Sequence, residues 1–215
     1  MRNILCFVAA VLLIAACKSK DKNKKIDAEV PFTEFRKSGD SVLITDSTWG
    51  WIVAGDSIET LKELYGGSNI RDETICGPEC VDSVDVTLVY PGSNREFVVY
   101  WEDSLYHKKI RLIRCNTKDA PYHTAGGIKI GTTLDKLVQM NGKPISFWGF
   151  GWDYGGTVFS LNHGVLENSG VAFRLEIMEN TDSDVVGDSE FNSDMPEVKA
   201  VQDKIYISEL LLRLQ

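Results

Sequence analysis

Five aromatic side chains are concentrated in ten residues, 147–156 (FWGFGWDYGG). Exposed tryptophan and tyrosine side chains offer large contact areas to proteins, and indole rings also stack on sugars. If this segment is a strand, Trp148, Phe150 and Trp152 lie on one face, opposite two glycines. That face either binds a partner or packs into the core, where the glycines would admit close neighbours. In the first case, the candidate binding residues are Trp148, Phe150, Trp152, Asp153 and Tyr154.

Two cysteines, Cys76 and Cys80, bracket the short segment Gly-Pro-Glu. In an oxidising compartment, a disulfide between them would close a small loop and contribute about 2 kcal/mol in the chain-entropy model. Cys115 is a third candidate, so the sequence leaves the pairing among these cysteines open. The segment has one residue more than the redox Cys-Gly-Pro-Cys box, and no helix is expected at its first cysteine. Redox catalysis is therefore not predicted.

Other residues that could do chemistry are scattered. The three histidines are far apart, and no Gly-x-Ser-x-Gly, His-Glu-x-x-His or phosphate-loop motif occurs. Residues 179–197 contain seven acidic side chains and no basic one. Clustered oxygens suit calcium, but this spacing fits no EF-hand loop and favours a solvated acidic insertion at about 179–198. We expect no enzymatic activity, no metal and no other cofactor.

The N-terminal residues indicate the compartment. A short basic start precedes the apolar run Ile4–Ala16, which is too short to cross a bilayer core of about 30 Å and is typical of a signal peptide. The run ends in Ile-Ala-Ala-Cys17, which resembles the bacterial lipobox. This resemblance implies removal of residues 1–16 and attachment of a diacylglycerol and an acyl chain at Cys17, enough for stable anchoring. The alternative is a plain secretory signal with an incidental Cys17.

A basic segment poor in apolar side chains follows the signal. Residues 18–27 contain five lysines and two aspartates, which predicts a flexible tether within 17–40. The whole chain has 23 Lys+Arg and 31 Asp+Glu and a formal charge of −8, so nucleic-acid binding is not expected. We expect the lipid to attach the protein to the outer membrane, with the body facing either the periplasm or the medium.

An internal repeat organises the rest of the chain. Thr48–Gly66 aligns with Thr124–Gly142 at a constant shift of 76, with six of nineteen positions identical. In each copy a hydroxyl side chain, of Ser57 or Thr133, is the expected N-cap of a short amphipathic helix. Each helix is expected to end at a glycine, which tolerates a left-handed backbone. The predicted helices lie within 55–66 and 131–142.

Strand-like runs follow each predicted helix. They lie at 84–90, 96–101 and 109–115 in the first copy and at 145–152, 157–163, 171–178 and 204–214 in the second. Alternating apolar and polar side chains place one face of such strands on a core. The sequence therefore predicts an α+β fold of two pseudo-repeats, 41–116 and 117–215, each a short helix packed on antiparallel β-strands.

The segment 127–156 (GIKIGTTLDKLVQMNGKPISFWGFGWDYGG) and the repeat around it resemble a class of small Gram-negative lipoproteins and inhibitors. These proteins are built on the β-lactamase-inhibitor-protein-like or SmpA/BamE-like unit. The resemblance implies binding or assembly roles and no shared catalytic residue. We expect a membrane-anchored, non-catalytic module that binds a cell-envelope protein. The alternative is a glycan-binding or glycan-processing surface lipoprotein that uses the aromatic strand 147–154.

Overall fold

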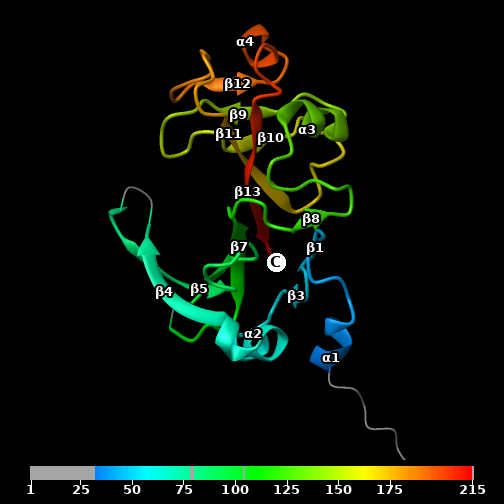
Figure 1. The fold of residues 1–215 in the computed structure, drawn as a ribbon, viewed down its shortest axis with the longest axis vertical. Coiled ribbons are helices and arrows are strands. Elements are labelled where there is room, and N and C mark those ends of the chain that lie inside the picture. The colour runs from blue at the N-terminus through cyan, green and yellow to red at the C-terminus, as the bar shows by residue number, and fades with distance from the viewer. Residues whose placement is uncertain (1–31, 78–79, 104, 215) are drawn as a thin grey trace, which may run out of the picture. The chain divides into compact units, whose positions relative to one another are not determined.

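An antiparallel sheet of six strands, in the order β11-β13-β7-β6-β5-β4, carries most of the strand pairing (Figure 1). Its strands are β4 (Ile70–Cys76), β5 (Ser83–Val89), β6 (Phe97–Trp101), β7 (Ile110–Cys115), β11 (Val171–Ile177) and β13 (Ile205–Arg213). The structure is a computed structural model that describes residues 32–77, 80–103 and 105–214. These residues belong to one unit, Pro31–Gln215.

Two smaller sheets complete the strands of the described residues. One has the order β3-β2-β1-β8 and the other β10-β9-β12, and only the pairing of β1 with β8 is parallel. Their strands are β1 (Leu43–Ile44), β2 (Thr48–Trp49), β3 (Ile52–Val53), β8 (His123–Thr124), β9 (Ser146–Trp148), β10 (Val158–Ser160) and β12 (Glu190–Asn192). The α-helices of the described residues are α1 (Phe32–Lys37), α2 (Ile58–Tyr65), α3 (Leu134–Asn141) and α4 (Pro196–Lys199), and a 3₁₀ turn, η1, spans Gly67–Asn69. The predicted α+β class is confirmed.

The pairing of β13 with β7 in the large sheet joins the two halves of the chain. The final strand β13 pairs with β7, the last strand of the first half, and on its other side with β11. Equivalent strands of the two halves, β6 and β11, lie outside this pair, and their equivalent residues Phe97 and Phe173 are each 1% exposed. A duplicated unit would produce this order, and the division between residues 116 and 117 stays a prediction.

The two predicted helices form in equivalent places, as α2 and α3. The Ser57 hydroxyl accepts a hydrogen bond from the Thr60 amide at 3.5 Å, and Gly66 ends α2 with a φ of 84°. Gly142 ends α3 in the left-handed conformation. The Thr133 prediction is wrong in one respect, because its hydroxyl makes no capping bond and donates instead to the Asp135 carboxylate.

The larger of two apolar clusters lies on one face of the large sheet, and a smaller cluster contains Val86, Leu88 and Tyr100. Alternate residues of β11, together with the apolar positions of α2 and α3, pack into a single cluster. The fully buried aromatic side chains Trp49, Phe97 and Tyr122 meet within it, with ring centroids 5.1 to 5.8 Å apart. Burial of this apolar stripe, rather than helix propensity, stabilises helices of only eight residues.

The N-terminal predictions fall largely outside the described residues. The expected signal peptide, Cys17 and the lysine-rich segment are among them. The expected tether is nevertheless helical at α1, where Arg36 Nη1 donates to Asp56 Oδ1 at 2.9 Å and Nε donates to the Trp51 carbonyl at 2.8 Å. No helix in the described ranges is long and apolar enough to span a membrane.

The strand predicted over 145–152 is shorter than expected, because β9 ends at Trp148. Gly151 has a φ of 91°, which interrupts an extended strand. The chain instead changes partners, and the Phe150 amide donates to the Val185 carbonyl at 3.0 Å. The acidic segment expected as a solvated insertion supplies that partner, contains β12 and α4, and buries Val185, Phe191 and Val198.

Replacement of Leu210 by alanine tests the role of the pairing between β13 and β7. Leu210 is fully buried on β13 and lies opposite Phe173 on one side and Cys115 on the other. We expect the free energy of unfolding to fall by about 2–5 kcal/mol, because a cavity remains beneath three strands. The control is Leu105→Ala, a site 77% exposed, where we expect a change within about 0.5 kcal/mol. Urea unfolding followed by tryptophan fluorescence measures both, and equal effects would contradict the assignment.

Candidate functional site

Four aromatic side chains form a connected series on the surface, which we call the aromatic row: Phe159, Trp148, Trp152 and Tyr154. Ring centroids lie 5.1 Å apart for Phe159 and Trp148, 6.1 Å for the two tryptophans, and 5.4 Å for Trp152 and Tyr154. Phe159 is 44% exposed and Tyr154 50% exposed, and the tryptophans are half-buried. The rings meet at edge-to-face or tilted angles, a favourable packing that leaves parts of several rings facing solvent.

The structure divides the predicted binding residues between core and surface. Phe150 is 7% exposed and packs on buried Phe147, so the expectation that it shares a face with Trp148 and Trp152 is wrong. The physical reason is the turn that follows β9, which replaces the alternation of a strand. A Cβ atom at Gly149 would lie 2.7 Å from the Gly187 carbonyl, so only glycine permits this close packing. The aromatic segment is therefore partly core, at Phe150, and partly surface, at Trp148, Trp152 and Tyr154.

Arg174 of β11 holds the turn that carries Trp152 and Tyr154, two members of the row. Its Nε donates to the Gly155 carbonyl at 2.9 Å, and its Nη2 donates to the Asp153 carbonyl at 2.8 Å. The Trp152 indole N–H donates to the Gly149 carbonyl at 2.9 Å within the same turn. These bonds hold the backbone on both sides of Tyr154, and the Asp153 side chain stays exposed.

Glu209 of β13 lies between two arginines on the sheet face opposite the core. Its carboxylate is 3.0 Å from Arg114 Nε and 3.7 Å from Arg174 Nη1, and its side chain is 12% exposed. Burial alone would lower the pKa of Arg114, but the Glu209 carboxylate and the Tyr100 hydroxyl together raise it. One network of charges therefore links β7, β13 and β11 and reaches the turn beside the aromatic row.

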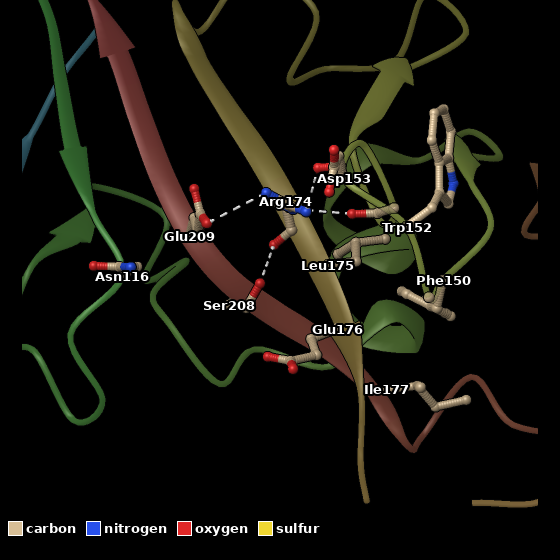
Figure 2. A pocket seen from close by; sticks show the side chains of 12 residues that line it. Asn116, Phe150, Trp152, Asp153, Arg174, Leu175, Glu176, Ile177, Ser208 and Glu209 are labelled. Carbon is tan, nitrogen blue, oxygen red and sulfur yellow. Dashed lines mark hydrogen bonds and ion pairs between the residues drawn. The ribbon is translucent and has the colours of Figure 1, made fainter. Parts of the chain in front are cut away.

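A cavity of about 690 Å³, which we call the polar hollow, opens beside this network. Figure 2 shows Arg174 in the middle of its lining, between Glu209 and the turn that carries Trp152 and Asp153. Phe150 contributes apolar wall, and further polar lining comes from Asn116, Glu176 and Ser208. The hollow thus offers hydrogen-bond acceptors, an amide and one indole to a ligand. Among residues 32–77, 80–103 and 105–214, no cluster of three or more His, Cys, Asp or Glu side chains could hold a metal ion.

The structure also resolves the cysteine pairing that the sequence left open. Cys76 and Cys80 form a disulfide with their Cα atoms 4.8 Å apart, at the end of β4. Cys115 is a free, fully buried thiol on β7. Burial raises its pKa to about 11, so the reactive thiolate is disfavoured there.

Several residues of the site were not identified from the sequence. Arg174 and Glu176 alternate with apolar neighbours on β11, which marks them as facing away from the core. Glu209 follows Ser208 at an irregularity of β13, where alternation does not indicate its face. No local pattern identifies the partners of these residues, because Arg114 and Glu209 are 95 residues apart. Phe159 was not identified either, because it lies on a strand of three residues, which is too short to show a distinctive sequence pattern.

The fold and site define an α+β protein with an exposed aromatic row beside a polar hollow. The chain matches no protein-family model, and no curated protein sequence matches it. Among solved structures, it is similar to the uncharacterized protein YfeY from Escherichia coli. The TM-score is 0.46 at 13% sequence identity, and the match covers 79% of this chain and 98% of that chain.

Replacement of Arg174 by methionine should loosen the turn. The variant leaves the Gly155 and Asp153 carbonyls without their donor, which should cost about 1–3 kcal/mol of unfolding free energy. We also expect faster amide exchange over 151–157, measured by hydrogen–deuterium exchange. Arg174→Lys keeps the charge near Glu209. Its unfolding free energy and exchange rate should lie between those of the parent and the methionine variant, since an ammonium is a less suitable donor to two carbonyls than a guanidinium. Unchanged exchange in the methionine variant would show that Arg174 does not hold the turn.

Proposed function

We propose that this protein is a cell-envelope lipoprotein without catalytic activity that binds an envelope protein through the aromatic row. The observation that supports this is the row itself. Exposed tryptophan and tyrosine side chains dominate the binding energy of many protein interfaces. Strands β9 and β10 present Trp148 and Phe159, and the turn held by Arg174 presents Trp152 and Tyr154, so little conformational freedom would be lost on binding.

Membrane attachment forms part of the same proposal. A lipidated Cys17 would anchor the protein in the outer membrane. The lysine-rich segment after it would itself lie near the anionic headgroups, whereas the acidic body would be held off that surface. The support for this comes from the residues before Cys17 and from the resemblance to small Gram-negative lipoproteins. The proposal leaves the body facing either the periplasm or the medium.

Glycan binding or processing is the second candidate function. One observation favours it: Trp152 and Asp153 line the polar hollow together with Asn116 and Glu176. An indole with carboxylate and amide groups at its edge suits a sugar ring, which has apolar faces and a rim of hydroxyls. The same surface could then serve a neutral glycan instead of a protein.

A double substitution separates these candidates. Trp148→Ala with Trp152→Ala removes the middle of the aromatic row, and we expect the loss of about 2 kcal/mol or more of binding free energy at an aromatic hot spot. The measurement is an affinity pull-down from cell envelopes with the full chain as bait, run beside a glycan array. Proteins retained by the parent and lost by the variant support the proposal, whereas glycan signals lost by the variant support the second candidate.

The matched control removes exposed apolar surface elsewhere. Leu105→Ala with Tyr106→Ala changes two side chains that are 77% and 64% exposed. We expect this variant to retain the same partners as the parent. Circular dichroism must show both double variants folded, and a folded tryptophan variant that keeps every partner would refute the aromatic row as the binding surface.

The anchor is tested by Cys17→Ser. The substitution removes the thiol that would carry the diacylglycerol, so the protein should move from the membrane fraction to the soluble fraction. Labelling with radioactive palmitate should disappear at the same time. Unchanged fractionation and labelling would refute lipidation at Cys17, and protease treatment of intact cells would then show which side of the membrane the parent protein faces.

A further inference from the structure

The polar hollow continues into a second cavity along the large sheet. This second cavity has a volume of about 560 Å³ and shares Asn116, Glu176 and Ser208 with the first. Together they form one depression over β11 and β13, which we call the sheet groove. Trp152 lies toward one end, and Tyr206 of β13 lines the other.

The charged side chains that line the sheet groove give it a net negative charge. Arg174 and Glu209 are both in the lining, and they pair with each other. The remaining charged residues of the lining are Lys118 and four acids, Asp119, Asp153, Glu176 and Glu179. Within the described part of the chain, none of these four acids forms an ion pair. Unpaired carboxylates in a hollow attract cations.

The hydrogen-bonding groups of the groove also suit a peptide. Carboxylates only accept, so they match lysine and arginine donors, whereas the Asn116 amide can both donate to and accept from a peptide backbone. The Ser208 hydroxyl donates to the Arg174 carbonyl at 3.3 Å and can still accept from a backbone N–H. The Tyr206 hydroxyl donates to Glu176 Oε2 at 3.4 Å, and burial together with Glu176 raises the pKa of Tyr206, so that hydroxyl stays protonated. The rings of Trp152 and Tyr206 can additionally contact cationic side chains.

We propose that the sheet groove binds an extended, lysine- or arginine-bearing segment of a protein partner. This rests on the proposed function and adds the chemistry of the partner to it. The aromatic row would supply sequence-tolerant contact area beside the groove, and the groove would select for positive charge. Charge complementarity of this kind mainly sets specificity and association rate.

The test uses the full chain in detergent and three synthetic ten-residue peptides of serine and glycine with zero, three or six lysines. The groove variant combines Asp119→Asn, Glu176→Gln and Glu179→Gln. The control variant combines Glu63→Gln, Glu167→Gln and Asp188→Asn, which are exposed acids outside the groove lining. Both variants change the net charge equally, so a general attraction of basic peptides to an acidic protein would affect them equally.

We expect affinity, measured by fluorescence anisotropy, to rise with lysine number and to fall with added salt. The groove variant should bind the six-lysine peptide about tenfold more weakly than the parent, which corresponds to three weakened charge contacts. The control variant should stay within about twofold. Equal losses in the two variants, or equal affinity for all three peptides, would overturn the proposal.

A neutral sugar probe provides the competing outcome. If chitotetraose binds the parent, loses affinity in the groove variant, and no lysine peptide binds better than the uncharged one, the groove is a glycan site and the proposal fails. Failure of the proposed function has a different signature. In that case the tryptophan double variant keeps its envelope partner in the pull-down, whatever the lysine peptides do.

Discussion

The pairing of β13 with β7 is the constraint on which the rest of the structure depends. β13 is the last strand of the described chain, and its pairing with β7 joins the strands of the two halves into the six-stranded sheet. Its inward residues, such as Leu210 and Leu212, lie in the core, and its outward Glu209 lies between arginines of the neighbouring strands. The core and the candidate site therefore lie on opposite faces of the same strand, and both require contacts between residues far apart in the sequence.

Local signals in the sequence predicted α2, α3 and most of the long strands because each depends on a few neighbouring residues, whereas β4 was not predicted. Ser57 with its apolar spacing, and Gly66 after it, are sufficient to indicate where α2 begins and ends. Alternation likewise located β5, β6, β7, β11 and β13. The pattern failed at β9. The alternation of aromatics and glycines continues past Trp148, but the extended strand ends there. The partner that redirects it is the segment around Val185, which no local pattern reveals.

The candidate site was predicted only in part for the same reason. The aromatic residues attract notice by type, so Trp148, Trp152 and Tyr154 could be proposed from the sequence. Arg174 holds the turn that carries Trp152 and Tyr154, but in the sequence it is an ordinary charged residue on an alternating strand, and its bonds to the Asp153 and Gly155 carbonyls follow only from the fold. Residue type thus indicates candidate contact groups, whereas the groups that position them follow from the tertiary fold.

The aromatic row combines exposure with fixed geometry, and this combination has a physical consequence. Neighbouring Phe147 and Trp148 point to opposite sides of β9, one into the core and one into the row. The row is thereby attached to a buried aromatic layer instead of a mobile loop. The hydrogen bonds of the Trp152 indole to the Gly149 carbonyl and of Arg174 to the Gly155 carbonyl further limit movement of the row. A surface that keeps large apolar groups exposed and ordered loses less entropy on association, as the proposed binding role requires.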